Sequence, residues 1–362
     1  MAQSIALIGC GRIGFMLEED PLRKKPCTHY GGTLSVGLKI THACDIHQSR
    51  LSKFAEHAGI PRSSCYTDYQ SLISEVKPEL VIIATWTESH AQIGIHAAEN
   101  GVKVIVCEKP VASNLDDAHA LIRACEKNGT RLIINHERRY DPRYIQVKKL
   151  LDSNQVGEVQ TVNAMVLTGG SNGNSRIEAG GGPLLQDGTH MVDIIRYYFG
   201  NILNVRGRFT RDMQSSGFED RATAWLRTER GMDIFLEAGG KREYFHFELQ
   251  VYGTRGKIVI GNGYQHLYMS NESRYYTGFK DLVEVPFPGF ENENYFTREY
   301  KEAAALLNGD DLTILSGGDD GLKALEIVHA VYLSAYMDRD VQLPLTGASI
   351  DLEMIFPIVE AS

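Results

Sequence analysis

The stretch Ile5-Ala-Leu-Ile-Gly9-Cys-Gly11-Arg-Ile-Gly14 decides the fold of this chain. Four apolar residues, typical of a short buried strand, stand directly before the pattern G-x-G-x-x-G. In such a turn the first glycine permits a tight bend, the second lets a pyrophosphate approach the backbone, and the third allows close packing of helix on strand. The helix that follows offers unpaired N–H groups to the phosphates. A glycine-rich turn can also be only a turn, but this context predicts a dinucleotide site that includes Gly9, Gly11, Arg12 and Ile13.

A carboxylate at the end of the second apolar run strengthens this interpretation. Asp45 follows the run 38–44, where an acidic side chain accepts hydrogen bonds from the adenosine ribose diol. The same charge would repel a ribose 2′-phosphate, so NAD is favoured over NADP, although Arg50 leaves NADP open. Asp45 lies 31 residues after Gly14 instead of about 20. We interpret the surplus, Pro21–Gly32, as an inserted loop.

The first part of the chain alternates between two periodicities. The apolar runs expected as buried strands are 5–8, 38–44, 80–84, 102–107 and 131–135, and the helical patterns are 48–58, 69–76, 90–99, 115–127 and 142–151. This alternation predicts βαβ units and a doubly wound parallel sheet, the Rossmann type of α/β fold.

The pattern changes after Gly157. Strand-like segments joined by short turns occur at 159–166, 205–210, 222–227, 232–238, 243–252 and 257–260, and helical patterns return at 296–307 and 321–337. These features predict an α+β domain with an open, mostly antiparallel sheet. We therefore expect a nucleotide-binding domain at 1–136 and a substrate-binding and oligomerisation domain at 137–362. Alternating strands such as 245–251 give that sheet an apolar face for a homodimer or homotetramer.

Composition excludes several classes of protein. Among 362 residues, 46 Asp and Glu outweigh 37 Lys and Arg, and this formal charge of −9 disfavours nucleic acid and anionic membranes as partners. No apolar run reaches the roughly 18 residues that a membrane helix needs. The amino terminus has no basic region of a secretory signal. Six cysteines without a C-x-x-C pair indicate a reduced, cytoplasmic protein with no metal site.

Two further strand ends carry polar side chains. Thr85-Trp86 and His90 follow the run 80–84, and Glu108-Lys109-Pro110 follows 102–107. The carboxyl ends of parallel strands border the ligand crevice of such sheets. A partly desolvated lysine beside a cofactor can act as a general acid or base. The alternative for Lys109 is a surface lysine that ends a strand. The alternative for His90 is a histidine with a structural hydrogen bond.

These motifs together resemble the Gfo/Idh/MocA oxidoreductase family. The resemblance extends over nearly the whole chain, through Glu137-Arg-Arg-Tyr-Asp-Pro142 and Gly180-Gly-Gly-Pro-Leu-Leu-Gln-Asp-Gly-Thr-His-Met-Val-Asp193. It implies an N-terminal Rossmann domain, a C-terminal domain with an open sheet, and NAD(P)-dependent oxidation or reduction of sugars or cyclitols.

The resemblance also assigns roles. Lys109 matches the family's catalytic lysine, His190 its second-domain acid/base histidine, and Arg138 a position near nicotinamide and substrate. Many relatives carry an aspartate four residues before the histidine, where this chain has Gln186. Asp187 stands three residues before it and, if the segment is helical, faces the same side. The implied cofactor contacts add Thr85, Trp86, His90, Glu108 and Lys109. The implied substrate contacts are Lys109, Glu137, Gln186, Asp187 and His190.

The sequence thus predicts an NAD-dependent oxidoreductase. It would transfer a hydride between nicotinamide and a secondary hydroxyl or carbonyl of a sugar, sugar derivative or cyclitol. Two alternatives stay open, namely an NAD-dependent glycosidase with internal redox cycling and a catalytically silent NAD-binding regulator.

Overall fold

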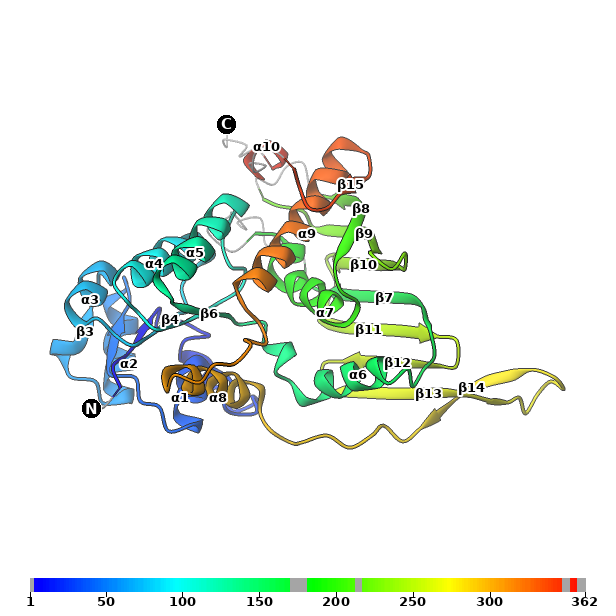
Figure 1. Ribbon diagram of the computed structural model, residues 1–362, viewed down its shortest axis with the longest axis horizontal. Helices are drawn as coiled ribbons and strands as arrows, with labels where there is room; N and C mark the ends of the chain where they lie inside the picture. Colours follow the sequence, from blue (N-terminus) through cyan, green and yellow to red (C-terminus); the bar gives the residue numbers. More distant parts are fainter. Residues whose placement is uncertain (1–2, 170–180, 212–216, 347–351, 357–362) are drawn as a thin grey trace. The chain divides into compact units, whose positions relative to one another are not determined.

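The computed structural model describes residues 3–169, 181–211, 217–346 and 352–356 (Figure 1). Contacts among Cα atoms divide the chain into two compact units. The first comprises 1–141 with 293–322, and the second comprises 142–292 with 323–362. The sequence-based division assigned 293–322 to the C-terminal domain, whereas these residues group with 1–141.

The first unit is built on a six-stranded parallel sheet with the order β3-β2-β1-β4-β5-β6. Its strands are β1 (Ile5–Ile8), β2 (His42–Cys44), β3 (Cys65–Tyr66), β4 (Leu80–Ile83), β5 (Val104–Cys107) and β6 (Arg131–Ile134). Every residue of β1, β4 and β5 is buried, as expected for parallel strands covered on both faces. This strand order confirms the predicted doubly wound fold.

Helices cover both faces of this sheet. They are α1 (His29–Ser35), α2 (Gln48–Ala58), α3 (Tyr69–Val76), α4 (Thr87–Glu99), α5 (Leu115–Asn128) and α8 (Tyr295–Leu307), with 3-10 turns at Met16–Glu19, Arg62–Ser64 and Glu137–Arg139. Local signals delimit several of them. The Asn114 side chain accepts a hydrogen bond from the N–H of Asp117 at the start of α5, and Gly129 ends that helix in the left-handed conformation. On one face α4 packs between α3 and α5, while α8 packs on α1 and β5 on the other.

The segment after the glycine turn differs from the predicted loop Pro21–Gly32. The chain leaves the helical path after Gly14 and returns at His29. The backbone N–H groups of His29 and Tyr30 donate to the carbonyls of Ile13 and Gly14, each at 3.0 Å. Helix α1 thus continues the turn that the glycines begin, and residues 15–28 are looped out. The prediction was wrong for 29–32, which are helical because they resume this interrupted helix.

The second unit contains a nine-stranded sheet with the order β14-β13-β12-β11-β7-β10-β9-β8-β15. Its strands are β7 (Val159–Leu167), β8 (Ile202–Thr210), β9 (Arg221–Thr228), β10 (Asp233–Gly239), β11 (His246–Gly253), β12 (Gly256–Gly261), β13 (Tyr264–Glu272), β14 (Lys280–Val285) and β15 (Val341–Gln342). Only β7 and β10 pair in parallel, which confirms the mostly antiparallel prediction. The hairpin β13–β14 was not anticipated from the sequence.

Helices pack against one face of this second sheet. They include α6 (Pro142–Asp152), α7 (Thr189–Phe199) and the part of α9 (Gly318–Met337) that belongs to this unit, and a short α10 (Leu352–Ile355) follows. A Cβ on Gly207 of β8 would lie 2.3 Å from the carbonyl oxygen of Val331, so α9 approaches the strand through a glycine. The opposite face carries Trp225, which is 56% exposed. Across the described ranges, no helix combines the length and apolar character needed to span a bilayer.

Candidate active site

The glycine turn has the geometry that a dinucleotide site requires. Gly9 has a φ of +98°, and a Cβ there would lie 2.4 Å from the carbonyl oxygen of Ala84. A Cβ on Gly14 would lie 2.1 Å from the carbonyl oxygen of Gly9, whereas one on Gly11 would meet no heavy atom within 4 Å. Gly9 and Gly14 are therefore needed for packing, and the backbone at Gly11 is open to a ligand. In the same turn Arg12 is exposed and Ile13 half-buried.

The carboxylate of Asp45 is fixed at this turn. One oxygen accepts a hydrogen bond from the backbone N–H of Cys10 at 2.9 Å, and the other accepts from the N–H of His47 at 2.7 Å. Asp45 is only 6% exposed. Because each carboxylate oxygen has a second acceptor position, Asp45 is oriented and still able to accept from a diol. The open Gly11 backbone and this fixed acceptor both fit the adenosine half of NAD.

His90 links the ends of the fourth and fifth strands. Its Nδ1 lies 2.8 Å from the carbonyl oxygen of Pro110, and its Nε2 lies 3.1 Å from that of Thr85. Burial lowers the pKa of His90, and the two carbonyls oppose this shift only in part. A neutral ring carries one N–H and donates to one of these two carbonyls, which is the structural hydrogen bond that the sequence left as its alternative role. The Lys109–Pro110 peptide is cis, Lys109 is half-buried and Trp86 is exposed.

A buried polar cluster is centred on Glu108, the residue directly before Lys109. Glu108 accepts hydrogen bonds from Nδ2 of Asn135 at 2.7 Å and from Nε2 of His29 at 3.1 Å. The other ring nitrogen of His29 lies 2.8 Å from the hydroxyl of Tyr300. Sequence reasoning missed His29, Asn135 and Tyr300. No local signal marks them, since His29 lay in the presumed loop and Tyr300 in the second domain.

Two more glutamates belong to this region of the first unit. Glu137 forms an ion pair with Arg138 at 2.7 Å. Glu299 of α8 is fully buried, and neither carboxylate oxygen has a hydrogen-bond partner within the described part of the chain. Burial, together with the charges of Glu108, Glu137 and Glu302, raises the pKa of Glu299 well above its usual value.

In the second unit the predicted residues lie on one helical segment. Leu184–Gly188 form a π-helical turn that runs directly into α7, so Asp187 and His190 lie on continuous helix. The segment is helical as the prediction required, but the i,i+3 rule holds for an α-helix and Asp187 lies in the π-helical turn, so its role beside His190 stays a prediction. The amide of Gln186 donates to the carbonyl of Gly181 at 2.9 Å, and His190 is 8% exposed. Gly180 of the matching motif lies outside the described residues.

Glu219 supports the start of this segment and was also missed. It is fully buried and accepts a hydrogen bond from the backbone N–H of Leu184 at 2.8 Å. The hydroxyl of Tyr332 lies 3.1 and 3.0 Å from its two oxygens. Burial raises the pKa of Glu219 to about 7, although these hydrogen bonds oppose the shift.

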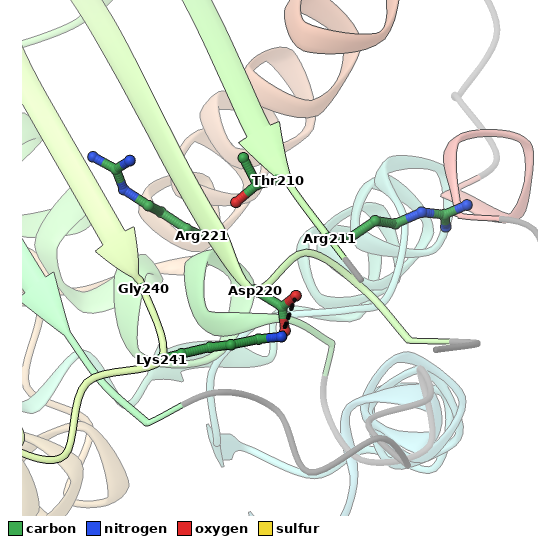
Figure 2. A pocket seen from close by; sticks show the side chains of 6 residues that line it. All are labelled: Thr210, Arg211, Asp220, Arg221, Gly240 and Lys241. Atoms are coloured by element: carbon green, nitrogen blue, oxygen red, sulfur yellow. Dashed lines mark ion pairs between the residues drawn. The ribbon is translucent and has the colours of Figure 1, made fainter. Parts of the chain in front are cut away.

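A cavity of about 310 Å³ lies elsewhere in the second unit (Figure 2). It is lined by Thr210, Arg211, Asp220, Arg221, Gly240 and Lys241. The amine of Lys241 reaches over to Asp220 at 3.1 Å, and Arg221 pairs with Glu237 at 2.8 Å. The side chains of Arg211 and Arg221 point away from each other, so the cavity does not present a converging set of cations. It contains none of the predicted site residues.

The cysteines and acidic residues supply no metal centre in the ranges that the structure describes. All six cysteines are free thiols.

Comparisons with known proteins match both parts of the chain. A family model described as "Oxidoreductase family, NAD-binding Rossmann fold" matches residues 3–136, and one described as "GFO/IDH/MocA C-terminal domain" matches residues 144–259. The D-apiose dehydrogenase of Paraburkholderia graminis is 29% identical over 85% of this chain and 84% of its own length. The scyllo-inositol 2-dehydrogenase (NAD(+)) of Bacillus subtilis is 28% identical over 72% of this chain and 75% of its own.

Solved structures share the fold. The aldose-aldose oxidoreductase of Caulobacter crescentus, complexed with glycerol, superposes with a TM-score of 0.79 at 22% identity, covering 95% of this chain and all of the other.

Proposed function

Because the chain belongs to the Gfo/Idh/MocA oxidoreductase family, we propose that it is an NAD-dependent dehydrogenase of sugars, sugar derivatives or cyclitols. The observation that carries this proposal is the edge of the parallel sheet in the first unit. There the open glycine turn, the fixed carboxylate of Asp45 and the Glu108-Lys109 pair all follow the carboxyl ends of strands. In such folds that edge is the ligand side of the sheet.

Residues of the first unit would hold the cofactor. The backbone around Gly11 would receive the pyrophosphate and Asp45 the ribose hydroxyls, with Thr85, Trp86, His90, Glu108 and Arg138 as further proposed contacts. Bound NAD supplies the hydride acceptor, and the protein supplies orientation and proton transfer. A 2′-phosphate beside the Asp45 carboxylate would be repelled, which supports a preference for NAD over NADP.

Lys109 is the proposed proton carrier. Its amine would take the hydroxyl proton of the substrate as the carbinol carbon is oxidised, the usual work of a general base. We propose His190 of the second unit as the second acid/base group and Asp187 as the carboxylate that polarises it. Glu137 and Gln186 are proposed substrate contacts. Replacing Asp187 with Asn should lower kcat if this carboxylate substitutes for the family aspartate absent at Gln186.

The experiment is a panel of polyols, aldoses, inositols and chromogenic glycosides with NAD, scored by NADH absorbance and, for the glycosides, by release of the chromophore. We expect sustained, stoichiometric NADH formation with at least one member. Product release from a glycoside without net NADH would instead identify the glycosidase alternative. NAD binding without turnover of any substrate would favour the silent regulator. The panel therefore separates all three.

We further propose that the protein works as a homodimer or homotetramer that associates through the open face of the second sheet. The rings of Trp225 and Phe235 pack against each other there with centroids 5.4 Å apart and planes tilted by 59°. Trp225 is exposed and Phe235 is half-buried, and such aromatic surface supports an interface on this face. Light scattering should give the mass of an oligomer, and Trp225→Glu should lower it. A monomer at micromolar concentration would contradict the proposal.

The free thiols support the expectation of a reducing, cytoplasmic setting.

A further inference from the structure

A line of buried hydrogen bonds ends at the residue beside Lys109. It runs from the hydroxyl of Tyr300 through the ring of His29 to Glu108 and the amide of Asn135, at 2.8, 3.1 and 2.7 Å. The four residues come from α8, α1 and the ends of β5 and β6. Tyr300 and His29 are fully buried, and Glu108 and Asn135 are at most 7% exposed.

The geometry determines which ring nitrogen of His29 carries a proton. An ionised carboxylate only accepts hydrogen bonds, so Nε2 of His29 has to donate to Glu108. In a neutral ring Nδ1 is then an acceptor, and the hydroxyl of Tyr300 donates to it. Burial beside Glu299 and Glu108 raises the pKa of Tyr300 well above its usual value, so the phenol retains its proton. Tyr300 thus sets the tautomer in which His29 donates to Glu108.

Glu108 needs this support because its surroundings disfavour a charge. Burial alone would raise its pKa, yet the hydrogen bond from His29, the charge of Lys109 and the hydrogen bond from Asn135 hold that pKa below its usual value. The titratable groups that interact with Glu108 from its own strand and from the neighbouring elements are His29, His90, Cys107, Lys109, Glu137, Glu299 and Tyr300.

Glu108 in turn orients the lysine. Its second oxygen lies 3.2 Å from the backbone N–H of Lys109 and accepts its hydrogen bond. A carboxylate there fixes the backbone that presents the amine and adds a negative charge next to it. Protonation of Glu108 would remove that charge.

The looped-out segment 15–28 is what delivers His29. Glu18 accepts hydrogen bonds from the backbone N–H of Cys27 at 3.0 Å and from the hydroxyl of Thr28 at 2.7 Å, and this closes the loop directly before His29. The ring of His29, the first residue of α1, therefore lies in the core and contacts Glu108 at the end of β5.

We propose that His29 is a positioning residue for the reaction, which keeps Glu108 a carboxylate and thereby orients Lys109. The inference rests on the proposed function insofar as Lys109 is the proton carrier. Its structural core, that His29 sets the ionisation of Glu108, can be tested on the protein without cofactor or substrate.

The first experiment follows the carboxyl carbons of the glutamates by NMR in the full chain, labelled at Cδ, with Glu108→Gln identifying the resonance. His29→Leu removes the donor, and we expect the Glu108 midpoint to rise by about one pH unit or more. His29→Gln keeps an N–H donor and should restore most of the shift. His96→Gln is the matched control, because it replaces a histidine of α4 that contacts Ser74, and it should leave the Glu108 midpoint unchanged. An unchanged midpoint in His29→Leu overturns the inference.

The second experiment uses turnover on the best substrate of the panel. The acid limb of the kcat/KM profile should move to higher pH in His29→Leu, so that activity falls about tenfold at acid pH and recovers as pH rises. A loss that is equal at every pH would indicate a merely structural role and overturn the proposal. If His29→Leu does not fold, Tyr300→Phe decides, because loss of its hydroxyl should shift the Glu108 midpoint in the same direction by a smaller amount. No shift in Tyr300→Phe would then overturn it.

If the wild type oxidises nothing in the panel, the proposed function fails, while the NMR titration still decides whether His29 controls Glu108. The two failures are therefore distinguishable.

Discussion

Replacing Glu219 with Gln should stabilise the second unit in a pH-dependent way. Burial raises the pKa of Glu219 to about 7, whereas an unfolded glutamate titrates near 4.5. Between these two values the folded state binds the proton more tightly than the unfolded state does. Stability therefore falls as pH rises through this window.

The magnitude follows from the size of the shift. A difference of about 2.5 pKa units corresponds to about 3.4 kcal/mol at 1.36 kcal/mol per unit, fully expressed above pH 7. Gln is neutral at every pH and keeps an oxygen to accept from the N–H of Leu184 and an amide to pair with Tyr332. We therefore expect Glu219→Gln to exceed the wild type by about 2–3 kcal/mol at pH 8 and to lie within about 1 kcal/mol of it at pH 5.

Urea unfolding followed by circular dichroism between about pH 5 and 8 measures this difference. Because the two units can unfold in separate transitions, only the transition that the variant moves is compared. Glu243→Gln, at an exposed glutamate of the same unit, is the matched control and should leave the pH dependence unchanged. Equal slopes for Glu219→Gln and the wild type across the window would refute the argument that burial raises this pKa.

Three other changes test the site and the fold. Lys109→Ala should lower kcat by about 10²–10⁴-fold, while the NAD dissociation constant, measured by calorimetry, changes little. A loss of activity explained entirely by weaker NAD binding would make Lys109 a cofactor anchor. The wild type should bind NAD several-fold more tightly than NADP, and Asp45→Asn should reduce that preference, because the repelling charge is gone; equal affinities for the two cofactors in the wild type would contradict the role of Asp45. Asn114→Ala removes the acceptor for the N–H of Asp117 at the start of α5 and should lower the free energy of unfolding by about 1 kcal/mol, measured by urea titration; no loss would show that the cap is dispensable.

Local patterns were sufficient for much of the first unit. The helices predicted at 48–58 and 69–76 have those bounds in the structure, because a C-cap glycine or an N-cap aspartate lies directly beside each apolar pattern. Buried strands and the glycine turn are equally local, since four apolar residues followed by G-x-G-x-x-G already specify strand, bend and helix start.

Where the local pattern was weak, prediction failed. In the hairpin of β13 and β14 most residues are exposed or half-buried, so no apolar run marks either strand. The prediction of a loop at Pro21–Gly32 failed for a different reason. The helical part of this segment begins at His29 only because the N–H groups of His29 and Tyr30 donate to the carbonyls of Ile13 and Gly14, each sixteen residues earlier in the chain.

The sequence by itself determined the two kinds of sheet, the nucleotide turn and Asp45 as a candidate, because short-range periodicity and motif spacing encode these features. Lys109 and His190 became candidates through the resemblance of longer motifs to a known family. Only the tertiary structure decided which polar groups support them. His29 reaches Glu108 across 79 residues and Tyr300 across 271, and Glu219 reaches Leu184 across 35. Such contacts depend on which strands are neighbours and which helix covers them. Burial and the hydrogen bonds made in the packed core then shift the pKa values of Glu108 and Glu219 in opposite directions, and no local stretch of sequence contains either influence.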